Sequence, residues 1–129
     1  MLELGIKGKE TVVVSEVNSA KTMGSGTLDV FATPAMIALM EQTAWKSVAK
    51  ELEEGSGTVG IRLEVSHDAP TPFGMTVTCE SELVKIDGRK LTFELRAYDE
   101  QGDIGKGIHE RFIINNEKFQ IKANEKGTK

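Results

Sequence analysis

Apolar and polar residues alternate along most of the second half of the chain, as they do in strands that bury one face. The first such run begins after residue 58, and its apolar positions are Val59, Ile61, Leu63 and Val65. The apolar positions of the next two runs are Met75, Val77, Cys79 and Leu83, and then Leu91, Phe93, Leu95 and Ala97. A fourth run extends from Ile104 to Ile114. The pattern predicts four strands.

Turn signals separate these runs. Asp87-Gly88 is a strong hairpin signal between the second and third runs, residues 69–74 are rich in proline, and residues 99–103 form another polar break. We therefore expect at least the last three strands to form an antiparallel meander. An earlier β-branched cluster, Thr11 to Val14, suits one more strand, and the polar residues 18–26 read as a loop.

Between these strand signals lies one long helical segment. Thr33 occupies an N-cap place and Pro34 the first helical position, which is the usual start of a helix. Residues 35–54 contain no glycine or proline, and Gly55 and Gly57 follow as a stop signal. We expect an α+β fold in which a five-stranded antiparallel sheet wraps around one long central helix, the hotdog arrangement. Two such sheets commonly join edge to edge, so we also expect a homodimer.

Length and composition agree with one domain over residues 1–129, with a polar tail at 124–129 that frays. The net charge of -4 disfavours nucleic-acid binding. No apolar run is long enough to span a membrane, and the first twenty residues do not resemble a signal peptide. A lone cysteine, Cys79, forms no internal disulfide, so we expect a cytoplasmic protein. Neither metal-ligand spacing nor a phosphate loop is present, and we expect no cofactor.

Three residues violate the pattern around them. Glu41 lies in the apolar stripe of the helix with Ile37 and Ala44, so it is either a carboxylate turned toward the core or the edge of the stripe. His67 continues the buried face of its strand and lies beside the proline-rich turn. It is either a residue that transfers protons or a histidine at a strand end whose hydrogen bonds are made within the protein. Thr33 places a hydroxyl among the free N–H groups of a helix start, where it suits an oxyanion or serves as an ordinary cap.

Other prominent residues have simpler interpretations. His109 and Arg111 share a face opposite Ile104 and Phe112, which predicts a surface or partner-interface location. Cys79 is expected in the core rather than as a nucleophile. Met36, Met40 and Trp45 are expected in core or dimer packing.

Several segments are similar to the fluoroacetyl-CoA thioesterase-like family, a hotdog family, in register from about residue 23 to 123. These segments are VFATP (30–34), LME (39–41), TVG (58–60), VSH (65–67), APTPFGMTV (69–77) and GIHER (107–111). The resemblance implies that Thr33, Glu41 and His67 are catalytic. It also implies that Gly60 offers a backbone N–H beside the thioester carbonyl and that Arg111 borders the acyl pocket.

The expected function is therefore hydrolysis of a small or short-chain acyl-CoA, with Phe31, Met36 and Phe73 lining a compact acyl pocket. In this mechanism Glu41 acts as general base for water or as nucleophile. Thr33 polarises or positions Glu41, and His67 relays a proton. Two other functions stay open at this point. One is a non-catalytic module that binds acyl-CoA or another small ligand, and the other is a hotdog enoyl-CoA hydratase.

Overall fold

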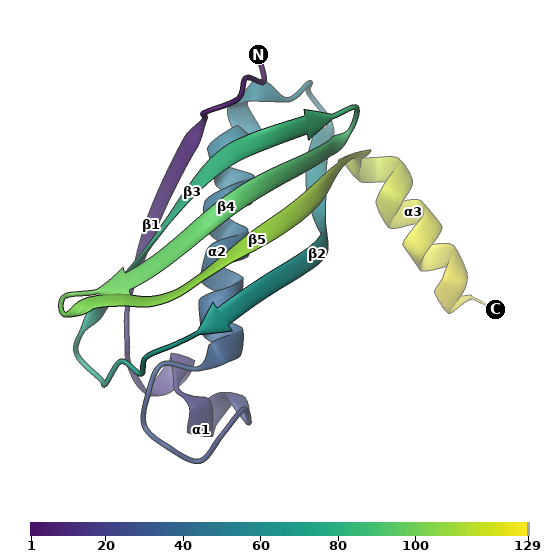
Figure 1. Ribbon diagram of the computed structural model, residues 1–129. Coiled ribbons are helices and arrows are strands. Elements are labelled where there is room, and N and C mark those ends of the chain that lie inside the picture. The colour runs from purple at the N-terminus through teal and green to yellow at the C-terminus, as the bar shows by residue number, and fades with distance from the viewer. Residues whose placement is uncertain (129) are drawn as a thin grey trace.

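A computed structural model describes residues 1–128, and its centre is a five-stranded sheet with the strand order β1-β3-β4-β5-β2 (Figure 1). All neighbouring strands are antiparallel. The strands are β1 (Lys7–Val13), β2 (Ser56–His67), β3 (Thr76–Asp87), β4 (Lys90–Asp99) and β5 (Gly102–Asn115). The long helix α2 (Thr33–Val48) lies against one face of the sheet and continues into the 3-10 turn η2 (Ala49–Glu51). The predicted hotdog arrangement is confirmed. Among the described helices, none has the length and apolar character needed to cross a membrane.

Strands β3 and β4 carry the alternation that the sequence predicts. Their inward residues are buried against α2, and they include Val77, Cys79, Leu83, Leu91, Phe93, Leu95 and Ala97. A two-residue loop, Gly88–Arg89, joins the paired residues Asp87 and Lys90. Cys79 has no exposed surface, and burial raises the pKa of its thiol to about 11. The cysteine is therefore a core residue, as expected.

The start of α2 differs from the prediction by one residue. Ala32 is the N-cap, Thr33 is the first helical residue, and no side chain caps this end of the helix. Thr33 is therefore not an ordinary N-cap, and its hydroxyl is free to contact another element. The regular helix also ends at Val48, earlier than the predicted end near residue 54, because the chain tightens into η2 before it turns at Gly55.

A β-bulge in β2 reverses the predicted orientation of Ile61. The pairing of β2 with β5 shifts between Gly60 and Arg62, so Ile61 is the extra residue and its side chain is 50% exposed. Because an inserted residue inverts the alternation, Gly60 faces α2 before the bulge and Leu63 and Val65 pack on the core after it. The prediction of one continuous apolar face from Val59 to Val65 was wrong at Val59 and at Ile61, because Gly60 is the residue that faces α2 before the bulge.

A second bulge, in β5, overturns the surface prediction for His109 and Arg111. The register with β4 shifts so that Ile104 is the extra residue, and both Ile104 and Gly105 are buried. Beyond this bulge the odd-numbered residues face α2. His109 has no exposed surface and Arg111 is only 6% exposed, whereas Phe112 faces outward. The sequence predicted that residues in step with Ile104 face the core, and the extra residue reverses this, so His109 and Arg111 face α2 instead of the surface.

Additional short elements complete the chain. The predicted loop 18–26 contains the helix α1 (Ala20–Met23), preceded by the turn η1 (Glu16–Asn18). The predicted polar tail is instead largely helical in α3 (Asn116–Gly127), which the Asn115 side chain caps by accepting from the N–H of Lys118. Lys129 lies outside the described residues. Helix α3 buries none of its residues and projects away from the sheet beyond the β2 edge (Figure 1).

Candidate active site

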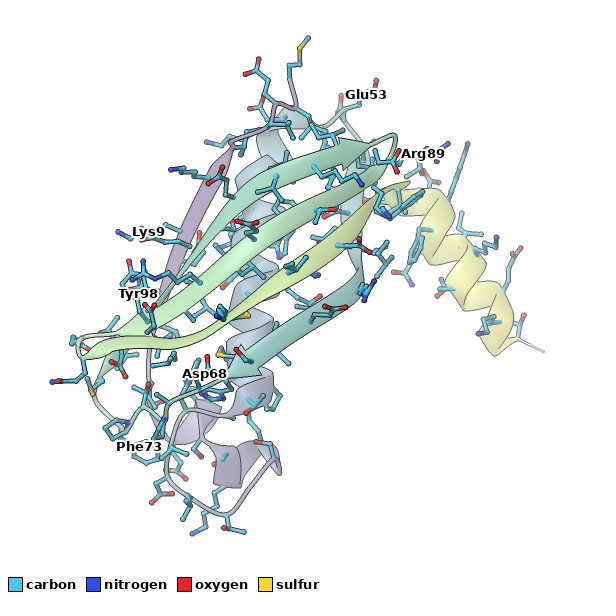
Figure 2. The ribbon with its side chains drawn as sticks, in the orientation of Figure 1. Lys9, Glu53, Asp68, Phe73, Arg89 and Tyr98 are labelled. Atoms are coloured by element: carbon cyan, nitrogen blue, oxygen red, sulfur yellow. The ribbon has the colours of Figure 1, made fainter. Side chains whose placement is uncertain are left out.

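Thr33 and His67 meet where the start of α2 passes the end of β2. The Thr33 Oγ1 and His67 Nδ1 atoms lie 2.8 Å apart, at hydrogen-bond distance. The second ring nitrogen, Nε2, is buried and has no hydrogen-bond partner among residues 1–128. Burial lowers the pKa of His67 below 6.5, against an opposing effect of the neighbouring Asp68 carboxylate. Figure 2 places Asp68 just beyond the end of β2. A neutral imidazole with one unoccupied nitrogen is thus available for proton transfer near pH 7.

Glu41 lies at the edge of the α2 stripe rather than in the core. Its side chain is 41% exposed, and its Oε2 atom lies 3.4 Å from Nη1 of Arg111, whose side chain is only 7% exposed. The carboxylate sits over Gly60 of β2, where an added Cβ would lie 2.7 Å from Oε2. The glycine therefore makes room for the carboxylate.

Arg111 is anchored to β2 and β5 by contacts that the sequence did not indicate. Its Nε donates to Thr58 Oγ1 at 2.8 Å, and its Nη2 donates to the Thr58 carbonyl at 2.9 Å. Its Nη1 lies 3.1 Å from Nε2 of His109. Burial lowers the pKa of Arg111, and the Glu41 carboxylate opposes that effect. Thr58 and His109 are thus site residues that sequence reasoning missed, because two bulges set which side chains face α2.

Within one chain, the three predicted catalytic residues form two separate groups. Helix α2 rises by about 12 Å between Thr33 and Glu41. Gly60 and His67 are seven positions apart along β2, which corresponds to roughly 20 Å of strand. The structure brings Thr33 to His67 and brings Glu41 to Gly60 and Arg111, but it does not join the two groups.

An open groove of about 640 Å³ runs along the outer side of α2 beside Glu41 and Arg111. Phe31 also lines this groove, together with Trp45 and other residues of α2 and β1. Met36 is fully buried in the core, and Phe73, 41% exposed in the turn before β3, is not among the residues that line the groove (Figure 2). Of the three residues expected to line an acyl pocket, only Phe31 shares a groove with Glu41 in one chain.

Comparison with known proteins identifies the family. A family model described as fluoroacetyl-CoA-specific thioesterase matches residues 14–117. The chain belongs to the fluoroacetyl-CoA-specific thioesterase family. The fluoroacetyl-CoA thioesterase of Streptantibioticus cattleyicolor is 43% identical over 98 residues, which cover 76% of this chain and 70% of that protein. Membership of the thioesterase family makes the protein a thioester hydrolase.

Solved structures of this thioesterase family agree with the fold. A structure of the fluoroacetyl-CoA thioesterase FlK superposes with a TM-score of 0.92 at 34% identity, with 98% of each chain covered. A Thermus thermophilus protein described as a thioesterase superfamily member superposes with a TM-score of 0.89 at 26% identity, covering 98% of this chain and 93% of the other. The similarity to both structures extends over nearly the whole chain.

Proposed function

We propose that the protein hydrolyses small or short-chain acyl-CoA thioesters to the free acid and CoA in the cytoplasm, with Thr33, Glu41 and His67 as catalytic residues. The hydrogen bond between Thr33 and His67, with a buried and unpartnered His67 Nε2, carries the proposal. The family is described as specific for fluoroacetyl-CoA, and one structure of a relative is described as a complex with acetyl-CoA. Both acyl groups are small, which favours a short acyl chain here.

The proposed active form is a homodimer joined along the β2 edge. Strand β2 ends the sheet, so its outer side offers free backbone groups for pairing with a second copy. An antiparallel pairing centred between Leu63 and Glu64 sets Gly60 of each chain opposite the partner's His67. Glu41 then approaches the partner's Thr33 and His67. Each active site therefore combines Glu41 of one chain with Thr33 and His67 of the other.

In the proposed reaction, a water molecule or Glu41 itself attacks the thioester carbonyl carbon. If water attacks, the Glu41 carboxylate takes its proton as general base; if Glu41 attacks, an anhydride forms and water then cleaves it. Either path makes a tetrahedral oxyanion, which the Thr33 hydroxyl and a backbone N–H near Gly60 stabilise by hydrogen bonds. Collapse of the oxyanion breaks the carbon–sulfur bond. His67 accepts on Nε2 the proton that water gives up through Glu41 and passes it to the CoA thiolate, so that the imidazole ends neutral; in the anhydride path this proton comes from the water that cleaves the anhydride.

The environment of Glu41 supports a charged role for this residue. Arg111 is nearly buried and directs one guanidinium N–H at the carboxylate, so the ionised side chain has a fixed counter-charge. The adjacent groove is lined by apolar side chains that include the partly exposed Trp45 and the nearly buried Phe31, which suits a short acyl chain. The fluoroacyl preference of the family's namesake is not part of the proposal.

A thiol-release assay over a panel of short, medium, halogenated and aromatic acyl-CoAs tests the proposal. We expect release from short acyl-CoAs, and loss of most turnover in a folded Glu41→Gln variant. Normal turnover by that variant would remove Glu41 from the mechanism. Binding of acyl-CoAs without any thiol release would instead indicate a non-catalytic binding module, and loss of enoyl absorbance without release would indicate a hydratase.

Mixing two inactive variants tests whether the site is shared between chains. Equal amounts of Glu41→Gln and His67→Gln, refolded together, give mixed dimers in which one of the two sites retains all three residues. Random pairing of the two variants predicts about a quarter of wild-type turnover. If all three residues acted within one chain, every site in the mixture would lack one residue and turnover would stay at the level of the variants.

A further inference from the structure

His109 is a buried histidine in the middle of β5 that the mechanism above does not use. Its side chain has no exposed surface, and its ring lies 6.3 Å from that of Phe93, centroid to centroid. Both ring nitrogens have partners. Nδ1 lies 2.8 Å from the carbonyl oxygen of Arg62, and Nε2 lies 3.1 Å from Nη1 of Arg111. A buried histidine with two defined partners has one geometry and one protonation pattern.

The chemistry of the two partners fixes the tautomer. A carbonyl oxygen can only accept a hydrogen bond, so the proton is on Nδ1. A guanidinium can only donate, so Nε2 carries a lone pair and accepts from Arg111. A second proton on the ring would point an N–H at the guanidinium and place two cations in contact. Burial, reinforced by Arg111 and opposed by the Arg62 carbonyl and Glu41, lowers the pKa of His109 below 6.5.

The β2 bulge makes this arrangement possible. Because Ile61 is the extra residue, the Arg62 carbonyl comes within reach of His109 on the neighbouring strand. Nη1 of Arg111 is then shared by two groups, His109 at 3.1 Å and Glu41 at 3.4 Å, while Thr58 holds the other two nitrogens. Thr58 thus sets the plane of the guanidinium, and His109 is the protein contact that shares Nη1 with the carboxylate.

We propose that His109, as its neutral Nδ1–H tautomer, is a positioning residue that links the bulge carbonyl of Arg62 to Arg111 and so orients the Arg111 guanidinium toward Glu41. The proposal rests on the proposed function insofar as Glu41 is catalytic. His109 itself does not touch the substrate. The charged groups that face it are Arg111 on its own strand and Glu41 on α2, while Phe93 on β4 is apolar.

Two substitutions of similar shape separate positioning from packing. His109→Gln keeps an amide donor and an acceptor oxygen, whereas His109→Met fills a similar volume with neither. Loss of one hydrogen bond to a buried cation lowers kcat by about tenfold or more in His109→Met, with KM little changed. We expect His109→Gln to restore most of kcat. Equal kcat values in the two variants at equal thermal stability would overturn the proposal.

The ring nitrogens give a readout that does not depend on catalysis. The chain has two histidines, so ¹⁵N spectra of the wild type and of His67→Gln assign both rings. We expect His109 to show a protonated Nδ1 and a bare Nε2 at pH 7, unchanged on acidification until well below the titration of a free histidine. A protonated Nε2 at pH 7 would overturn the inference even if the enzyme is active. Conversely, if no thioester is hydrolysed, the expected tautomer still supports the link between Arg62 and Arg111, and only the role of Glu41 fails.

Discussion

The Glu41 carboxylate occupies the space that a side chain at position 60 would need, because a Cβ at Gly60 would lie 2.7 Å from Glu41 Oε2. The same Cβ would lie 3.2 Å from Cε1 of His109 and 3.4 Å from Nη1 of Arg111. The absence of a side chain at Gly60 of β2 therefore allows the Glu41 carboxylate of α2 to pack directly against the strand. A methyl group at this point changes where the carboxylate sits.

Gly60→Ala is expected to lower activity far more than stability. The nearest atom is the end of a flexible side chain, which can rotate away, and the 3.2 Å contact with His109 needs a shift of only a few tenths of an ångström, so the melting temperature falls by only a few degrees. A displacement of Glu41 by about 1 Å can lower kcat by roughly a hundredfold. Steady-state kinetics and thermal melts of the same preparation check this. Gly127→Ala is the control, because nothing lies within 4 Å of the added Cβ. Wild-type kcat in Gly60→Ala would contradict the fit described here.

Thr33→Val and Thr33→Ser distinguish the hydroxyl from the shape of the side chain. Valine removes the partner of His67 Nδ1 while it keeps the volume, and serine keeps a hydroxyl in reach. Loss of this hydrogen bond is expected to lower kcat by about tenfold or more in Thr33→Val and by less in Thr33→Ser. Thr33 makes no capping bond, so the melting temperature of both variants should stay near that of the wild type. A large loss of stability in Thr33→Val would show that the residue is structural.

The two histidines should make the protein less stable as the solution becomes acidic. Burial lowers the pKa of both His67 and His109 in the folded chain, whereas the unfolded chain binds protons near pH 6.5. The unfolded state therefore takes up protons first, and the free energy of unfolding falls as the pH drops through about 6.5. Urea denaturation at several pH values measures the slope. The double variant His67→Gln/His109→Gln should show a flatter profile, and an equal slope would assign the effect to other groups.

Substitution of Gly8, at the opposite edge of the sheet, is expected to lower stability. A Cβ at this residue would lie 2.7 Å from the Thr43 carbonyl oxygen and 2.8 Å from Cβ of Ser47, both of α2. These atoms belong to a helix that cannot yield easily, so Gly8→Ala should cost about 1–3 kcal/mol of unfolding free energy. Chemical denaturation checks the value against Gly127→Ala. Unchanged stability would mean that β1 moves away from α2 at little cost.

The strands β3 and β4 could be predicted from the sequence because their inward residues alternate without a break from Val77 to Leu83 and from Leu91 to Ala97; the register shift in β3 comes after Leu83. The two errors in side-chain orientation, at Ile61 and at His109, share one cause. Each follows from a single extra residue in a strand, which inverts the phase of everything beyond it. The glycines beside these positions, Gly60 and Gly105, are the only local signal of the bulges, and glycine has many other uses.

The candidate site could be predicted only in part for a related reason. Thr33, Glu41 and His67 each disturb a local pattern, so they can be selected one at a time. Which of them touch depends on how α2 crosses β2, and local periodicity carries no information about that. The contact between Thr33 and His67 is seen only in the tertiary structure. The separation of about 12 Å between Thr33 and Glu41, by contrast, follows from the predicted helix alone.

The buried Cys79 decides how cleanly the enzyme can be assayed. Reagents that measure released CoA react with thiolates. The Cys79 thiol has no exposed surface and a pKa of about 11, so almost none of it is present as an accessible thiolate. The protein holds no other cysteine. In its folded state it should therefore contribute no background colour, and the signal can be read as product even at enzyme concentrations high enough to detect a very slow substrate.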